Sequence, residues 1–289
     1  MRHRMIRLFM AALLWLLLSF PAPGAYADSP DRIVSLGPVI TDMIYLLGAQ
    51  DRLEAVTSYC NTPGNEEKEI IGTVMQMNVE KIVHLEPDLV IANALTRKKQ
   101  IRLLQKQGIH VIELETPQNF EQICSNFVQL GTLVGKEEKA KAVTAKARKR
   151  VRNIRETAGV LQKHTVFIQI GIKPLKTSPE HTFIHEYIEF AGGINIAKDA
   201  AEGVYSREKV LKKNPDVILI ATMGSSKKAG LREKETWRKF SFLKAVKNQN
   251  IHVLDPDIVC SPTPEVFAQG LADFFRLIHP DKKEEIRRE

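Results

Sequence analysis

Short, mostly apolar runs alternate along this chain with stretches in which apolar residues recur every three or four positions. The runs predict buried strands, and the periodic stretches predict helices. The expected strands are residues 32–36, 53–57, 89–92, 109–114, 165–170 and 217–220. The expected helices are residues 41–47, 79–85, 97–107, 120–133, 182–190 and 207–213. Strands that alternate with helices in this way form parallel βαβ units, so the expected fold class is α/β.

A long polar segment divides this alternation into two halves. Residues 136–157 contain many alanines, lysines and arginines and no strong helix breaker, which predicts one helix of about 30 Å. The halves on either side resemble each other, because Glu80 and Glu208 each lie seven residues before a Pro-Asp step that opens an apolar strand. We therefore expect two α/β lobes and a connecting helix, at residues 28–135, 159–289 and 136–158 respectively.

The first 27 residues have the pattern of a secretory signal peptide. Three arginines near the start are followed by an almost unbroken apolar run at residues 8–20, and small residues close the segment at 25–27. The apolar run is too short to cross a bilayer, so it does not predict a membrane helix. Because no cysteine precedes Cys60, we expect no lipid anchor at the cleavage point. The mature chain is expected to begin at Asp28 and to reach the periplasm of a Gram-negative bacterium.

Composition fits a globular protein, with 44% hydrophobic and 26% charged residues in a chain of 289. Arginines of the signal segment contribute part of the formal net charge of +8, and much of the remaining excess lies in residues 136–155. A basic stretch can bind nucleic acid, but no aromatic side chain interrupts this one. Given the periplasmic destination, we interpret it as the solvated face of a helix and expect no nucleic-acid partner.

The sequence lacks the short motifs of common hydrolases and nucleotide-binding enzymes. It contains no Gly-x-Ser-x-Gly, no His-Glu-x-x-His and no P-loop, and the Gly192-Gly193 pair lacks the spacing of a dinucleotide-binding turn. We therefore expect a protein that is not an enzyme and has no cofactor. His181, His185 and Glu189 are spaced by four residues and could bind zinc from one helix face. We interpret them as ordinary helix surface and expect no protein-bound metal.

Several segments carry a resemblance to a known family. They include Arg32-Ile-Val-Ser-Leu-Gly-Pro38, Leu85-Glu-Pro-Asp-Leu-Val90 and Val166-Phe-Ile-Gln-Ile-Gly171, with further matches at 56–63, 72–80, 192–199 and 206–210. In their order and spacing these segments resemble the periplasmic substrate-binding proteins of ABC importers for metal chelates, which include cobalamin, ferric siderophores and haem. The resemblance covers essentially all of the chain after the signal segment.

The resemblance implies a fold and a partner. The family has two Rossmann-like lobes on a single rigid connecting helix, residues 136–158 here, with the ligand in the cleft between them. Glu80 and Glu208 match, one in each lobe, the acidic residues by which family members dock onto arginines of the ABC permease subunits. Without the family, each would be an ordinary surface glutamate in the first turn of a helix, where the helix dipole favours it. A monomer that delivers a small-molecule metal chelate to the permease is expected.

The loops after the strands are expected to line the cleft, because ligands of open α/β sheets bind at the carboxyl ends of the strands. In the resemblance, Tyr59 matches an aromatic ligand contact and Asp257 matches an acidic contact to the polar edge of a corrinoid. The ligand-binding residues expected on these grounds are Pro38, Val39, Tyr59, Cys60, Val74, Met75, Asn93, Gly171, Ile172, Pro174, Tyr205 and Asp257.

The chain departs from the cobalamin-binding members at several of these positions. Val74 and Asn93 stand where those members have tryptophans, and Ser261 stands in place of an arginine near Asp257. Fewer aromatic side chains mean a smaller apolar contact area for a flat macrocycle. With these departures the resemblance supports a metal chelate better than it supports cobalamin itself. The likeness of the second lobe to the cobalamin-binding members still favours cobalamin or another corrinoid, with a ferric siderophore or haem as the alternative. A sensor or co-receptor that binds the same ligand is the alternative of another class.

The three cysteines allow two interpretations of the cleft. Cys124 lies in an apolar helical stripe and is expected to be a buried core thiol. Cys60 and Cys260 are expected in loops at the cleft mouth, one in each lobe. They could form a disulfide across the cleft or contact the metal of a ligand, but we favour two unrelated free thiols.

Overall fold

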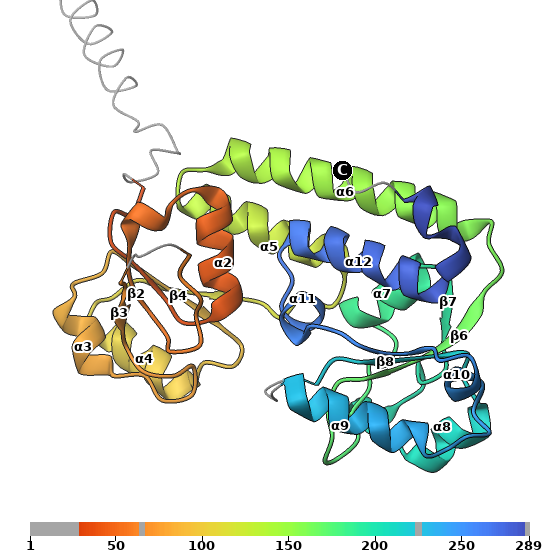
Figure 1. The fold of residues 1–289 in the computed structure, drawn as a ribbon. Helices are drawn as coiled ribbons and strands as arrows, with labels where there is room; N and C mark the ends of the chain where they lie inside the picture. Colours follow the sequence, from red (N-terminus) through yellow and green to blue (C-terminus); the bar gives the residue numbers. More distant parts are fainter. Residues whose placement is uncertain (1–28, 64–66, 223–226, 287–289) are drawn as a thin grey trace, which may run out of the picture.

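The computed structural model describes residues 29–63, 67–222 and 227–286. The predicted signal peptide lies outside these residues. Figure 1 shows two α/β lobes side by side, with a layer of long helices along one side of both. In the described ranges, no helix is both long enough and apolar enough to span a membrane.

The N-terminal lobe contains a five-stranded parallel sheet in the order β3-β2-β1-β4-β5. The four strands expected here from apolar runs are confirmed, and β3 is an additional edge strand of two exposed residues. The strands are β1 (Ile33–Ser35), β2 (Leu53–Val56), β3 (Glu69–Ile70), β4 (Leu89–Asn93) and β5 (Val111–Leu114).

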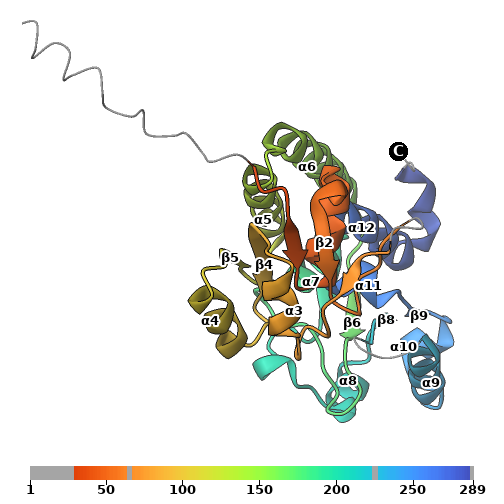
Figure 2. The ribbon, with the colours of Figure 1, turned by 90° about the vertical axis from the view of Figure 1, so that its left-hand side faces the viewer.

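Helices cover both faces of this sheet. The alternation of side chains along a strand places Ile33 on one face, against helices α2 and α5, and Val34 on the other, against α3 and α4. Figure 2 shows α3 and α4 on the side of the sheet opposite to α5. The helices are α2 (Pro38–Leu47), the 3-10 turn η1 (Gln50–Arg52), α3 (Val79–His84), α4 (Lys98–Lys106) and α5 (Phe120–Leu133).

The C-terminal lobe repeats this plan with a four-stranded parallel sheet in the order β7-β6-β8-β9. The two expected strands form its centre. The edge strand β7 was not expected, and it begins at Gly193, the second residue of the Gly192-Gly193 pair. The strands are β6 (His164–Gln169), β7 (Gly193–Asn195), β8 (Val217–Ile220) and β9 (Ile251–Val253). The helices are α7 (Phe183–Phe190), η2 (Ala201–Gly203), α8 (Arg207–Lys213), α9 (Lys227–Arg238), α10 (Lys244–Lys247), α11 (Pro256–Cys260), α12 (Pro264–Ile278) and η3 (Pro280–Glu285).

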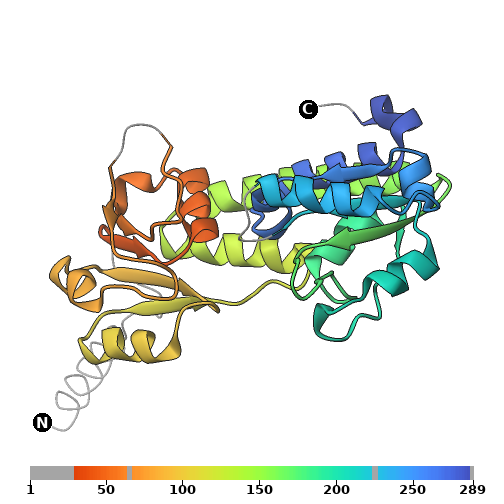
Figure 3. The same ribbon diagram turned by 60° about the horizontal axis from the view of Figure 1, so that its bottom comes forward.

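The long helix α6 (Glu137–Gly159) connects the lobes, but it does not do so alone. It packs along α5, and both helices contribute side chains to both lobes. At one end of α5, Phe120 belongs to the core of the C-terminal lobe, whereas Leu130 belongs to the core of the N-terminal lobe. On α6, Ala140 packs in the N-terminal core and Ile154 in the C-terminal core. The spacer is therefore an antiparallel helix pair, which Figure 3 shows running from one lobe to the other.

A column of four aromatic rings ties this spacer to the C-terminal lobe. Phe120 of α5 stacks on Phe267 of α12 with ring centroids 4.7 Å apart. Tyr187 of α7 stacks on the other side of Phe267 at 4.2 Å and on Phe274 at 4.8 Å. The four rings are almost completely buried. Each offset stack adds about 0.5–1.5 kcal/mol to the burial of the rings themselves.

Glu186 of α7 caps the first turn of α5. Its Oε2 accepts a hydrogen bond of 2.6 Å from the backbone N–H of Phe120, one of the N–H groups that lack a partner inside the helix. Burial raises the pKa of Glu186, although this hydrogen bond and the nearby Arg155 charge act in the opposite direction. Glu186 therefore carries a partly desolvated carboxyl group at the junction of the two lobes.

Replacing Glu186 with alanine is expected to destabilise the protein by about 1–3 kcal/mol, because it leaves the Phe120 N–H group without an acceptor. Glutamine keeps the acceptor and should cost less. Since the folded-state pKa of Glu186 lies above the unfolded value, folding takes up a proton, and the contribution of this group to stability falls as pH rises through the folded-state pKa. Urea unfolding between pH 4.5 and 7 should show this component in the wild type and not in the Glu186→Gln variant. An alanine variant as stable as the glutamine variant would contradict the capping role.

Candidate functional site

Each sheet has one point at which the strand order reverses. It lies between β1 and β4 in the N-terminal lobe and between β6 and β8 in the C-terminal lobe. Ligands of open α/β sheets bind outside the carboxyl ends of the strands at such points. The structure brings the turn at Gly37, directly before Pro38, against Asn93, the last residue of β4. A Cβ atom added to Gly37 would lie 2.5 Å from Nδ2 of Asn93, so glycine permits this close approach.

The carboxyl edge of the N-terminal sheet exposes large apolar side chains. Tyr59 after β2, Met75 after β3 and Leu95 after β4 are exposed by 70%, 51% and 67%. Val74 is nearly buried, so Met75 presents the apolar surface of that turn. Leu95 was not predicted. The sequence feature that could have indicated it is a large apolar residue in a loop that directly follows a buried strand. Pro38, Val39, Cys60 and Asn93 are partly exposed along the same edge.

In the C-terminal lobe, the turn after β6 carries three of the predicted residues, Gly171, Ile172 and Pro174. Ile172 is half-buried and Pro174 is exposed. The turn is closed by an antiparallel bridge between Gly171 and Lys176. Tyr205 differs from the prediction, because its ring lies in the lobe's core near Phe167 and its hydroxyl group donates to the backbone oxygen of Ile196 at 3.2 Å. A tyrosine two residues before a helix gave no indication of which way its ring points.

Two carboxylates from opposite lobes interact at one end of these edges. Asp257 lies in the first turn of α11, after the cap residue Asp255, and Asp42 lies in α2. Partial burial, and then the charge of Asp257, raise the pKa of Asp42. Figure 1 shows α11 on the side of the C-terminal lobe that faces α2. The ends of the two lobes therefore approach each other here with negative charge on both sides.

All three cysteines lie in the described ranges and are free thiols, so no disulfide joins the lobes there. Sγ of Cys60 lies 3.2 Å from Oγ1 of Thr57 and packs against the N-terminal core. Cys260 ends the short helix α11 rather than lying in a loop, and burial, followed by the charge of Asp257, raises its pKa to about 12. A thiol with that pKa is protonated at neutral pH and is a weak nucleophile. Cys124 is fully buried, as predicted, and burial raises its pKa to about 12.

The prediction that His181, His185 and Glu189 lie together on the surface of one helix is wrong. His181 precedes the helix, with a positive φ of 63°, so it does not share a helix face with the other two residues. His185 is buried, with Nδ1 3.0 Å from Nδ2 of Asn195 and Nε2 3.3 Å from the carboxylate of Glu189. No group of three or more His, Cys, Asp or Glu residues within the described ranges could hold a metal ion.

The two predicted docking glutamates occupy equivalent positions. Glu80 lies in the first turn of α3, two residues after the cap Asn78, whose Oδ1 accepts from the N–H of Lys81 at 2.9 Å. Glu208 lies in the first turn of α8, two residues after the cap Ser206. Both side chains are exposed. Hydrogen bonds from its own backbone N–H and from Ser206 lower the pKa of Glu208.

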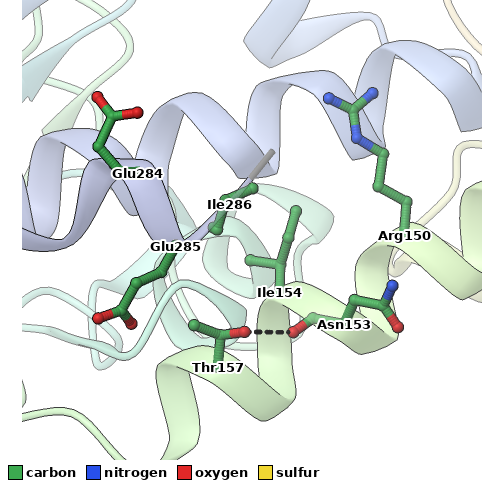
Figure 4. Close-up of a pocket in the computed structure, with 7 residues that line it drawn as sticks. All are labelled: Arg150, Asn153, Ile154, Thr157, Glu284, Glu285 and Ile286. Carbon is green, nitrogen blue, oxygen red and sulfur yellow. Dashed lines mark hydrogen bonds between the residues drawn. The ribbon is translucent and has the colours of Figure 1, made fainter. Parts of the chain in front are cut away.

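Two cavities lie away from all of these residues. One of about 780 Å³ is at the amino ends of the C-terminal strands and includes His164, Asp216 and His252. The other, of about 240 Å³, lies between α6 and the C-terminal turn η3. Figure 4 shows Arg150 and Ile154 on one side of it and Glu285 on the other.

Comparison with known proteins assigns this arrangement to a family. A family model described as "Periplasmic binding protein" matches residues 33–258, and the chain belongs to this family. It is 31% identical over 261 residues to an uncharacterized ABC transporter substrate-binding lipoprotein of Bacillus subtilis, covering 87% of this chain and 81% of the relative. It is 32% identical over 215 residues to the vitamin B12-binding protein of Yersinia pseudotuberculosis, covering 73% and 75% of the two chains.

Solved structures share the fold. A Staphylococcus epidermidis protein described as a possible iron-binding, periplasmic solute-binding protein superposes with a TM-score of 0.76 at 26% identity, covering 87% of this chain and all of that one. The two parallel α/β lobes are thus confirmed. The family consists of substrate-binding transport proteins rather than enzymes, so this chain is a substrate-binding protein of an ABC transporter.

Proposed function

We propose that this protein captures a metal chelate in the periplasm, with a corrinoid favoured, and delivers it as a monomer to the permease subunits of an ABC importer. The choice of ligand rests on one observation, which is that the carboxyl edge of the N-terminal sheet is apolar whereas the facing part of the C-terminal lobe carries a carboxylate. The N-terminal edge exposes Tyr59, Met75 and Leu95, which suits the broad apolar face of a macrocycle. Asp257 on the C-terminal side can accept hydrogen bonds from amide groups on the rim of such a ligand.

The acidic pair also separates the candidate ligands. A corrinoid has a rim of neutral amide groups, whereas haem carries carboxylates. Asp42 and Asp257 would repel those carboxylates, and like charges brought together cost free energy. An iron chelate remains the alternative ligand, and the possible iron-binding structural neighbour from Staphylococcus epidermidis supports it.

Calorimetric titration of residues 28–289 with cyanocobalamin tests this proposal, with haemin and a ferric hydroxamate siderophore as comparators. We expect submicromolar affinity for cyanocobalamin and weaker binding of haemin. Binding of the siderophore alone would move the assignment to iron chelates.

The apolar edge makes a second prediction. Tyr59→Ala and Leu95→Ala should each weaken cyanocobalamin binding about tenfold. Each removes an exposed apolar side chain whose contact with the ligand contributes roughly 1–2 kcal/mol to the binding free energy. Leu103→Ala is the matched control, since Leu103 is 40% exposed on α4, away from this edge. Equal affinities for all three variants would place the ligand elsewhere.

A further inference from the structure

A buried polar network lies beneath the first turn of α8. The fully buried Gln169 accepts a hydrogen bond from Nε1 of Trp237 at 2.8 Å and donates from Nε2 to Oε2 of Glu233 at 2.9 Å. The same carboxylate oxygen of Glu233 forms an ion pair with Nη2 of Arg207. The Arg207 guanidinium also lies over the Trp237 ring, 4.6 Å from its centroid. Four side chains from β6, α8 and α9 are thus joined through two acceptor groups.

This network connects the predicted ligand-facing turn to the predicted docking helix. Nε2 of Gln169 also donates to the backbone oxygen of Gly171, where the turn that carries Ile172 and Pro174 begins. At the other end, Arg207 directly precedes Glu208 in the first turn of α8. The backbone reinforces the link, because the N–H of Tyr205 donates to the oxygen of Leu175 at 3.1 Å.

The N-terminal lobe holds its docking helix differently. There, Nζ of Lys81 donates to the backbone oxygen of Ile70 at 2.8 Å and pairs with Glu69, and both charged side chains are well exposed. In the C-terminal lobe, the exposed fraction of the side chain is only 27% for Arg207 and 11% for Glu233. Desolvating an ion pair costs much of what the pair gains, so such a network mainly fixes orientation rather than adding stability.

We propose that Arg207 and Glu233 are positioning residues for transporter docking, which hold Glu208 at a fixed place relative to the ligand-facing turn. This inference rests on the proposed docking role of Glu208. Because Glu233 binds both Gln169 and Arg207, removing either charge leaves the other buried without its counter-charge and frees the first turn of α8. The N-terminal docking helix, with its exposed pair, should depend much less on its neighbouring charge.

The ligand-free protein provides the first test. In Arg207→Met and Glu233→Gln, the amides of Lys209 and Val210 should exchange with solvent at least about tenfold faster than in the wild type. In Arg207→Met, the carboxyl pKa of Glu208, followed by NMR, should also rise toward the ordinary glutamate value. Arg207→Lys keeps the charge and should restore part of the protection. Arg276→Met, which breaks the Arg276–Asp273 pair on α12, is the control for a general loss of stability.

Wild-type exchange of these two amides in both Arg207→Met and Glu233→Gln would overturn the proposal. The proposal would also be overturned if Arg276→Met accelerated the exchange of these amides equally, or if exchange were accelerated equally throughout the molecule. Uptake of labelled cyanocobalamin by cells separates this failure from failure of the proposed function. If Glu208→Lys leaves uptake intact, the docking role itself is wrong. If Glu208→Lys abolishes uptake and Arg207→Met and Glu233→Gln do not lower it, only the positioning role is wrong.

Discussion

A chain in which Glu80 and Glu208 are both replaced by lysine is expected to keep its ligand and lose transport. The two carboxylates are exposed, lie at equivalent positions in the first turns of α3 and α8, and come from different lobes. On the proposed docking role, charge reversal would replace attraction to permease arginines with repulsion at both points. We expect uptake of labelled cyanocobalamin to fall by about a hundredfold or more, because both charge-assisted contacts are lost. Calorimetry should show an unchanged dissociation constant for the ligand.

Single replacements and a control make this result interpretable. Glu80→Lys and Glu208→Lys should each reduce uptake less than the pair does. Glu156→Lys changes an exposed charge on α6 and should leave uptake near the wild-type level. A tenfold loss of ligand affinity in the double variant would place these glutamates in the ligand site instead. Normal uptake with normal affinity would remove them from the docking surface.

The second large effect is on stability. Phe267→Ala should lower the free energy of unfolding by about 3–5 kcal/mol, because Phe267 is fully buried and its loss leaves a cavity. Phe267 is also the ring that contacts both Phe120 of the spacer and Tyr187 of the C-terminal lobe. Its removal should therefore interrupt the aromatic column at the point where the spacer joins the lobe.

Urea unfolding measures this loss. Phe242→Ala is the control, since Phe242 is 54% exposed and its removal should change stability by no more than about 0.5 kcal/mol. Affinity of the folded Phe267→Ala protein for cyanocobalamin should remain close to that of the wild type, because the ring is fully buried and offers no surface to a ligand. A loss below about 1 kcal/mol would show that the ring is not tightly packed in solution.

The central strands could be predicted because a strand buried on both faces has a continuous apolar sequence, as Val217–Ile220 does. The edge strand β5 was predicted as well, but the edge strands β3, β7 and β9 were not. Both residues of β3 are exposed, and β7 begins at a glycine. Apolar periodicity placed α5 correctly but could not reveal that its two ends belong to different lobes, because one apolar stripe serves both cores.

The candidate site also has residues that could be predicted from the sequence and residues that could not. The equivalent positions of Glu80 and Glu208 could be predicted because a Pro-Asp step follows each of them after seven residues, and their docking role, which the resemblance implies, stays a prediction. Leu95 was missed, since one leucine in a loop has no periodic pattern. The pair of Arg207 and Glu233 is separated by 26 residues, so only the folded chain brings them together. His185 was assigned to a surface because spacing along a helix does not give its orientation.

The sharing of α5 and α6 between the two cores has a consequence for how this protein could be divided or recombined. Cutting before α6 separates Ala140 from Leu130, which pack in one core, and cutting before α5 separates Phe127 from the N-terminal sheet. No single cut in this region leaves both hydrophobic cores complete. A hybrid that takes one lobe from a relative must therefore take the helix pair with it and rebuild one of the two interfaces.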